Sequence, residues 1–370
     1  MKKVTIIGGG LSGLLTSIQL ARENIPVQLF EKKIYPFHRV CGEYISNETI
    51  PFLKSLDLYP GEFQPSTINR FQLTSVNGKS AIMPLDLGGF GISRYTFDHW
   101  LCQKAIQEGV ELHQGTEVDK IDFQEDQFIV SSHQKSFTAG LVVGSFGKRS
   151  RLDVNMGRKF IKKRSPYVGV KYHIKIDHAD GLIALHNFKD GYCGISHIEN
   201  GISNLCYLSH RRNLKRAGSI NAMEEQILFK NPFLKNIFNT AEFIFSQPET
   251  INEISFETKG PVDNHVLMAG DAAGMITPLC GNGMAMAIHS SKILSRQIVR
   301  FCKEESCSRE QLETAYAKEW QQQFATRLRI GRQLQNLFGS TFASNMAVGL
   351  ARNFKPLAVY LISKSHGKPF

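Results

Sequence analysis

Three glycines near the N-terminus have the spacing of a phosphate-binding turn. Gly8, Gly10 and Gly13 form the pattern GxGxxG between an apolar run, KVTIIGGG, and an amphipathic run that starts at Leu11. The first glycine permits a tight turn, the second lets a pyrophosphate approach the backbone, and the third lets a helix pack closely on a strand. The free N–H groups at the start of that helix would bind the phosphates.

An acidic residue follows at the position that binds a ribose. Glu31 ends the next apolar run, PVQLFEKK. A carboxylate there accepts hydrogen bonds from the ribose hydroxyls of an adenosine and repels a 2′-phosphate, which disfavours NADP at this site. Strand, glycine turn, helix and strand together predict one βαβ unit of a dinucleotide-binding domain. This pattern alone does not distinguish FAD from NAD.

A second segment, HVLMAGDAAGMITPLCGNGMAMAIHSSKIL, combines an apolar strand, an acid and small residues that lead into a helix. Asp271 ends the strand, and Pro278, Gly281 and Gly283 lead into the helix. The segment resembles the second FAD motif of the superfamily of geranylgeranyl reductases and class A flavoprotein hydroxylases, such as p-hydroxybenzoate hydroxylase. Asp271 would then hold a ribityl hydroxyl, and the positive end of the helix would stabilise the reduced flavin.

Two further segments resemble the same family. FHRVCGEYIS is similar to its R-x-C-G segment, and GISRYTFDHWLCQKA is similar to the entry of one of its helices. The resemblance implies that Arg39 and Arg94 lie along the FAD with Cys41 and Gly42 nearby, and that the backbone of Val118 meets the adenine. The expected cofactor-binding residues are Gly8, Gly10, Leu11, Ser12, Gly13, Glu31, Lys32, Arg39, Cys41, Gly42, Arg94, Val118, Asp271, Pro278, Gly281 and Gly283, and no metal site is expected.

The order of the expected elements predicts an α/β fold. We expect a Rossmann-like FAD-binding domain with an inserted, mainly antiparallel β-sheet substrate domain and a helical C-terminal region. Four strand-like runs with turn signals between Tyr167 and His210 indicate the insert. The expected boundaries are 1–75, 90–157 and 258–305 for the FAD-binding domain, 76–89 and 158–257 for the substrate domain, and 306–370 for a basic helical region.

The chain departs from the family's patterns at three points. Many class A hydroxylases carry an acid in a G-A-D-G segment, but residues 144–150 read GSFGKRS, which argues against an ordinary NAD(P)H-dependent hydroxylase. Residues 192–197 lack the Y-x-W-x-F-P segment of archaeal geranylgeranyl reductases, so an isoprenoid substrate has no support there. The halogenase motif W-x-W-x-I-P is absent too, since the two tryptophans are Trp100 and Trp320, which argues against halogenation.

Reduction of an alkene needs a hydride from the flavin and a proton from an acid. Cys41 is the preferred catalytic residue, as proton donor, because its loop is expected near the flavin ring. The alternatives are Glu43, which is expected to be an exposed carboxylate, and His38 and His197.

Three aromatic residues of the insert, Phe188, Tyr192 and Tyr207, would either line a substrate cavity or pack in the core.

Composition indicates a folded protein of a reducing compartment. The 370 residues include seven cysteines without CxxC or zinc-ligand spacing, so we expect free thiols. There is no apolar run of membrane-spanning length and no secretory signal, so the expected location is cytoplasmic, or peripheral to a membrane.

Positive charge is concentrated in two stretches of a chain whose net charge is +11. Residues 321–370 contain seven Lys or Arg and no Asp or Glu, and the stretch from Lys148 to Lys171 has nine Lys or Arg against one Asp. We expect either a solvated basic surface or a docking face for a lipid surface, a pyrophosphate or an acidic carrier protein. No nucleic-acid-binding motif accompanies the charge.

The sequence therefore predicts an FAD-dependent oxidoreductase. The preferred reaction is reduction or dehydrogenation of C=C or C–C bonds in a small apolar substrate, free or bound to a lipid or carrier. The first alternative is an FAD-dependent monooxygenase that hydroxylates or epoxidises. The second is a flavoprotein electron carrier that docks on an acidic partner. NAD(P)H and a redox partner protein are the candidate electron donors. A simple NAD-dependent dehydrogenase ranks below these, because it leaves the Asp271 segment unexplained.

Overall fold

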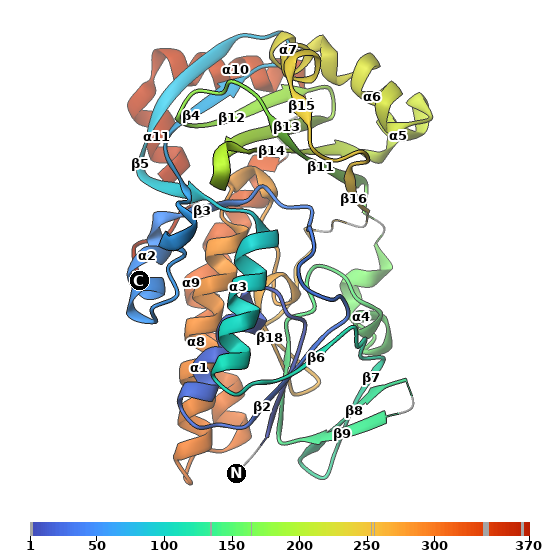
Figure 1. Cartoon of the computed structure of the whole chain (residues 1–370), viewed down its shortest axis with the longest axis vertical. Helices are drawn as coiled ribbons and strands as arrows, with labels where there is room; N and C mark the ends of the chain where they lie inside the picture. Colours follow the sequence, from blue (N-terminus) through green and yellow to red (C-terminus); the bar gives the residue numbers. More distant parts are fainter. Residues whose placement is uncertain are drawn as a thin grey trace.

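The structure is a computed structural model that describes residues 3–133, 135–163, 165–252, 254, 256–335, 340–363 and 366–370. Two bodies lie at opposite ends of the longest axis of the molecule (Figure 1). One contains a mainly parallel sheet with its helices, and the other contains a large, mainly antiparallel sheet. The chain crosses between them several times, so each body is built from separate parts of the sequence.

Buried strands form the parallel sheet. Its order is β17 (Val262–Asp263), β18 (Val266–Met268), β10 (Leu141–Gly144), β1 (Val4–Ile7), β2 (Val27–Glu31) and β6 (Glu111–Gln114). Strands β1, β2 and β10 are buried along their whole length, as expected for parallel strands that are covered on both faces. The predicted βαβ unit is confirmed, because β1 and β2 pair in parallel on either side of the first helix in the chain.

Helices cover one face of this sheet and a small sheet covers the other. Helices α1 (Leu11–Arg22), α3 (Arg94–Gln107) and α8 (Gly283–Lys303) pack against each other, and α9 (Arg309–Gln335) packs on α8. The small antiparallel sheet consists of β7 (Lys120–Gln124), β8 (Gln127–Ser132) and β9 (Lys135–Ala139). Phe137 of β9 packs edge-on against Phe30 of β2, which joins this sheet to the main core.

The large sheet contains the predicted insert. Its order is β15 (Glu242–Phe243), β11 (Tyr167–Lys175), β14 (Ser203–His210), β13 (Gly191–His197), β12 (Gly181–Phe188), β4 (Ser66–Thr74), β5 (Ser80–Gly91) and β3 (Tyr44–Ser46), with β16 (Glu249–Asn252) also paired to β11. The antiparallel strands predicted between Tyr167 and His210 are confirmed. Strand β4 pairs in parallel with β12 and antiparallel with β5.

Two groups of helices sandwich this sheet. Helices α5 (Arg211–Ala217), α6 (Ile220–Gln226) and α7 (Pro232–Thr240) pack on one face, where Phe188 contributes to the core. Helices α10 (Thr341–Asn353) and α11 (Lys355–Ser363) pack on the other through Val348, Ala351 and Ala358. The short helices α2 (Ile50–Ser55) and α4 (Arg151–Asn155) lie in connections of the parallel-sheet body.

The α/β class with a Rossmann-like domain is confirmed. The domain boundaries themselves stay a prediction, although β3 and β4, both within 1–75, pair in the large sheet. The predicted helical C-terminal region is observed as α9, α10 and α11, and the last two lie against the large sheet. Among the described residues, no helix is long and apolar enough to span a bilayer.

Candidate active site

A cavity of about 1210 Å³ lies between the two bodies. It opens at the ends of β1, β2 and β10, which is where open α/β sheets bind their ligands. Every expected cofactor-binding residue except Gly13 lines it. The lining includes Glu31 and Val118 as well as Pro278 and Gly283. The two sequence motifs, more than 250 residues apart, therefore meet at one cavity.

The glycines of the first motif have the backbone geometry that their spacing predicts. Gly8 has a φ of +107°, and a Cβ atom there would lie 2.4 Å from the carbonyl oxygen of Ser145. A Cβ atom on Gly13 would lie 2.1 Å from the carbonyl oxygen of Gly8, so Gly13 brings α1 against β1 instead of lining the cavity. At Gly10 the nearest atom to a Cβ is on Arg94, at 3.6 Å, so this position is open toward the cavity.

Two helix N-termini meet at the cavity. Among the described residues no side chain caps α1 or α8, and neither helix has an acid in its first turn. Their free N–H groups and positive ends therefore suit an anionic ligand. Ser12 adds a buried hydroxyl for which the described residues provide no hydrogen-bond partner. The open glycine, the unpaired hydroxyl and the two uncapped N-termini fit a ligand that carries phosphates, such as FAD.

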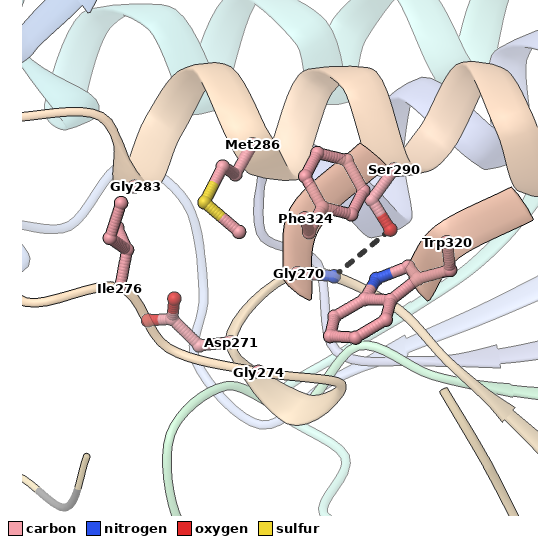
Figure 2. A pocket seen from close by; sticks show the side chains of 9 residues that line it. All are labelled: Gly270, Asp271, Gly274, Ile276, Gly283, Met286, Ser290, Trp320 and Phe324. Atoms are coloured by element: carbon pink, nitrogen blue, oxygen red, sulfur yellow. Dashed lines mark hydrogen bonds between the residues drawn. The ribbon is translucent and has the colours of Figure 1, made fainter. Parts of the chain in front are cut away.

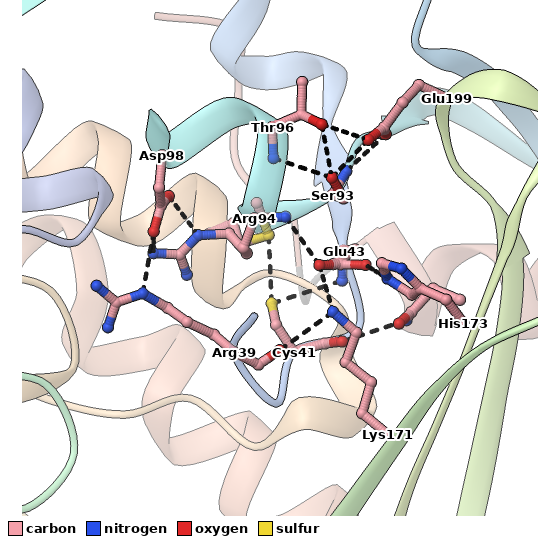
Figure 3. Close-up of polar contacts among 12 residues, drawn as sticks. Arg39, Cys41, Glu43, Ser93, Arg94, Thr96, Asp98, Lys171, His173 and Glu199 are labelled. Carbon is pink, nitrogen blue, oxygen red and sulfur yellow. Dashed lines mark hydrogen bonds and ion pairs between the residues drawn. The ribbon is translucent and has the colours of Figure 1, made fainter. Parts of the chain in front are cut away.

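Arginines beside α1 are held by buried carboxylates (Figure 3). Arg39 donates to Glu31 at 3.1 Å and to Asp98 at 3.0 Å, and Arg94 binds Asp98 through two N–H groups at 2.6 and 2.7 Å. Glu31 also accepts hydrogen bonds from the N–H groups of Gly9 and Lys33. Both cations are thus fixed before any ligand arrives, which lowers the entropy lost on binding.

Asp98 is a site residue that sequence reasoning missed. Asp98 lies in the segment GISRYTFDHWLCQKA, four residues after Arg94. That i,i+4 spacing places the two side chains on one helix face, and it was the available signal.

The loop around Asp271 is fixed by helices α8 and α9 (Figure 2). The N–H of Gly270 donates to the hydroxyl of Ser290 at 3.5 Å, and a Cβ atom on Gly274 would lie 2.8 Å from the indole of Trp320. Trp320 packs behind the loop, and the Asp271 carboxylate points away from it. The packing thus leaves this carboxylate available to the cavity, which Asp271 lines.

Two lysines lie beside the Asp271 loop. Lys148, in the segment that lacks the hydroxylase acid, lines the cavity, and desolvation lowers its pKa. Lys259 donates to the carbonyl oxygens of Lys148 at 2.6 Å and Asp271 at 2.9 Å. Desolvation lowers the pKa of Lys259 to about 8, although the negative charges of Asp153 and Asp271 oppose this shift. The segment in which many hydroxylases have an acid therefore carries Lys148 in this chain, and Lys259 lies beside it.

The prediction that Glu43 is an exposed carboxylate was wrong. Its side chain is completely buried, with Lys171 Nζ at 2.5 Å and His173 Nε2 at 2.7 Å from its two oxygens (Figure 3). It also accepts a hydrogen bond from the backbone N–H of Arg94 at 2.8 Å. Burial raises the pKa of Glu43, but Lys171 and His173 outweigh it and bring the pKa down to about 2. Glu43 is therefore ionised at neutral pH and does not donate a proton.

The basic stretch from Lys148 to Lys171 is not a continuous surface either. Lys171 is completely buried, and Arg158 is 5% exposed. Arg158 pairs with Asp153 at 2.8 Å and with Asp263 at 2.9 Å. The stretch was expected to form either a solvated surface or a docking face. Asp263 and Glu43, which pair with Arg158 and Lys171, are 105 and 128 positions away in the chain, so no local signal in the sequence indicates these pairs.

The other candidate proton donors differ in position. Cys41 lines the cavity with its Sγ 3.4 Å from Met284 Sδ at the start of α8. His38 also lines it, but burial, followed by the charge of Lys171, lowers its pKa to about 4, so it is neutral at pH 7. His197 bonds to the carbonyl oxygen of His178 and does not line this cavity.

Cys206 of β14 was not predicted and also lines the cavity. Burial, followed by the nearby Cys41, raises the pKa of Cys206 to about 12. Its thiol therefore keeps its proton at neutral pH. A cysteine on a predicted strand gives no sequence signal for such a role.

The part of the cavity over the large sheet is apolar. Leu185 and Leu208 line it from the sheet, and Met346 and Leu350 line it from α10. Of the three aromatic residues singled out in the sequence, Tyr192 lines the cavity and Phe188 packs in the core beneath α5–α7. Tyr207 lies beside the cavity, but its ring packs in the same core as Phe188 and its hydroxyl donates to Glu224 of α6.

Comparisons with known proteins identify the domain and several relatives. The family model described as "FAD binding domain" matches residues 1–329. "Conditioned medium factor receptor 1" of Dictyostelium discoideum is 23% identical over 361 residues, covering 87% of this chain and 68% of that protein. "Digeranylgeranylglycerophospholipid reductase 2" of Methanopyrus kandleri is 21% identical over 355 residues, covering 90% of this chain and 86% of that protein. The crystal structure of CmlS, a flavin-dependent halogenase, has the same fold, with a TM-score of 0.79 at 19% identity over 100% of this chain and 74% of that one.

Proposed function

The chain belongs to the FAD-binding domain family and is an FAD-dependent oxidoreductase, and from this premise we propose that it reduces or dehydrogenates a carbon–carbon bond of an apolar substrate. The observation that carries the proposal is the apolar lining of the cavity beyond the FAD-binding motifs, to which the large sheet and α10 both contribute. A pocket of this kind selects its ligand mainly by shape and hydrophobicity. The similarity to a protein named as a digeranylgeranylglycerophospholipid reductase supports the same reaction class.

Different residues of this chain would bind different parts of FAD and orient it. The N-termini of α1 and α8 would hold the phosphates and the flavin end of FAD, and Glu31 the ribose. Asp271 would bind a ribityl hydroxyl. When bound, FAD supplies hydride transfer to or from the substrate carbon. The apolar wall would exclude water from the reacting bond.

A thiol at the cavity would supply the proton that reduction requires. Cys41 is the preferred donor because it lies beside the start of α8, and Cys206 is the second candidate. A thiol that donates its proton becomes a thiolate, which the nearby positive charge of Lys148 would stabilise. Glu43 stays ionised and positions the loop that carries Cys41.

An FAD-dependent monooxygenase is the second candidate function. The fold that the chain shares with a flavin-dependent halogenase is compatible with this alternative. The absence of an acid in 144–150, where Lys148 lines the cavity, favours the reductase and a protein electron donor. An electron carrier without a substrate of its own would leave the apolar part of the cavity without a role.

Anaerobic titration of the purified holoprotein with NADH and NADPH distinguishes the reductase with a protein electron donor from the monooxygenase. For a reductase supplied by a partner protein, the visible flavin band should persist with either nucleotide and bleach with dithionite. Prompt bleaching by NADH or NADPH would contradict supply by a partner protein. Transfer of an oxygen atom to an apolar substrate when air is then admitted would contradict the proposed reaction and favour the monooxygenase. Boiled protein with the same FAD content serves as the control for free flavin.

A further inference from the structure

Large apolar side chains are exposed on the two C-terminal helices. Phe342 and Met346 of α10 are 76% and 60% exposed, Phe354 between the helices is 62% exposed, and Leu357 and Tyr360 of α11 are 47% and 55% exposed. Elsewhere in the described chain, exposed large apolar residues are scattered, with two at opposite ends of α3 and the others on separate elements or loops. A concentration of such side chains on neighbouring helices indicates an interaction surface.

The same side chains stand at the mouth of the cavity. Phe342, Met346 and Phe354 are exposed to solvent, and all three also line the cavity that extends to the FAD-binding motifs. The apolar part of the cavity therefore continues onto the exposed surface formed by Phe342, Met346 and Phe354. An apolar ligand that enters here stays in contact with apolar side chains.

The charged residues of α10 and α11 have a single sign. Arg352 and Lys355 are exposed on either side of Phe354 in the sequence. From residue 321 to residue 370 there is no acidic residue to oppose them. Arg327, by contrast, is paired with Glu48 at 3.5 Å. A basic rim around exposed apolar side chains is the pattern by which short helices lie in the interface of an anionic membrane.

We propose that α10 and α11 dock on the surface of an anionic bilayer and that the cavity takes its substrate directly from the lipid. The docking face is defined as Phe342, Met346, Arg352, Phe354, Lys355, Leu357 and Tyr360. The apolar side chains enter the boundary between headgroups and acyl chains, and the two cations contact anionic headgroups. An apolar substrate then reaches the cavity without crossing water. Substrate entry rests on the proposed function, but docking itself does not.

Flotation of the FAD-loaded protein with vesicles tests docking without any turnover. The protein should float with phosphatidylcholine vesicles that contain phosphatidylglycerol and should float much less with phosphatidylcholine alone. The double variant Phe342→Ser/Phe354→Ser should lose most of this binding. Lys355→Glu should lower the vesicle partition coefficient by at least about fivefold, the effect of one basic residue near an anionic surface.

Matched variants away from the docking face separate docking from general surface effects. Ile106→Ser removes an exposed apolar residue on α3, and Lys215→Glu reverses an exposed charge on α5. Both should float like the wild type, and all variants should retain FAD.

Three results would overturn the proposal. The first is a failure of the wild type to float with anionic vesicles, which would leave an acidic protein as the partner of these cations. The second is flotation of the docking-face variants at the wild-type level. The third is a dimer in solution that the double phenylalanine variant dissociates, since a second copy would then cover the face. A protein that floats as expected but neither reduces nor dehydrogenates an apolar compound would contradict the proposed function and leave docking intact.

Discussion

The Nζ atom of Lys171 lies 2.5 Å from Oε1 of Glu43, and neither side chain has any exposed area. Glu43 lies in the loop that lines the cavity after β2, and Lys171 lies in β11 of the large sheet. A charge without a partner at this depth would be strongly unfavourable. The pair therefore fixes the substrate-side sheet against the loop that carries Cys41.

Replacing Lys171 should lower the free energy of unfolding much more than replacing a lysine of a surface ion pair. Lys171→Met leaves the Glu43 carboxylate buried with one of its partners missing, and the free energy of unfolding should fall by about 3–5 kcal/mol. Lys175→Met on the same strand breaks a pair whose side chains are 60% and 69% exposed, and should cost less than about 1 kcal/mol. Denaturant unfolding followed by circular dichroism measures both, and equal losses would contradict the buried role.

Acid should lower the free energy of unfolding as Glu43 becomes protonated, and this loss should fall in a defined pH window. The pKa of Glu43 is about 2 in the folded protein and 4.5 as the ordinary value, so the unfolded chain binds the proton first. Its contribution to stability is complete above pH 4.5 and is lost as the pH falls toward 2. Glu43→Gln should therefore show a smaller loss of unfolding free energy across this window than the wild type. Parallel pH profiles would contradict the assignment.

Two glycines of one motif should respond differently to alanine. Gly10→Ala leaves the fold intact because its Cβ meets only Arg94 at 3.6 Å, but it obstructs the phosphates, so FAD affinity should fall at least about tenfold. Gly8→Ala forces a left-handed φ on alanine and a clash with Ser145, so the apoprotein itself should unfold at lower temperature. Thermal unfolding of the apoprotein and FAD titration by flavin fluorescence distinguish the two effects.

Removing the Asp271 carboxylate should weaken FAD binding. Asp271→Ala should raise the dissociation constant for FAD at least about tenfold while the apoprotein keeps its circular dichroism spectrum. Asp122→Asn on β7 changes a carboxylate far from the motif and should bind FAD like the wild type. Full flavin occupancy in Asp271→Ala would show that the second motif has another role.

The elements that the sequence predicted well are those with local signals. The turn at Gly8 and the alternating runs from Tyr167 to His210 each combine a periodicity with glycine or turn residues over short distances. The convergence of the two motifs on one cavity was predicted through the family resemblance, since local pattern alone does not bring residues so distant together.

The buried charges were not predictable in the same way. The partners of Glu43 lie 128 and 130 positions along the chain, and nothing local to either residue indicates the pairing. The exposed position expected for Glu43 followed from the usual preference of carboxylates. The packing of α10 and α11 on the large sheet was also missed, because helical periodicity does not indicate which surface a helix covers.

Anaerobic reoxidation of the reduced holoprotein tests the central claim most directly. Dithionite-reduced protein is mixed, without oxygen, with vesicles made from the lipids of the organism that encodes it, and the visible flavin band is followed. The account predicts that the oxidised band returns and that a lipid product has gained two hydrogen atoms. A flavin that stays reduced until oxygen is admitted, with a product that has gained an oxygen atom, would contradict it.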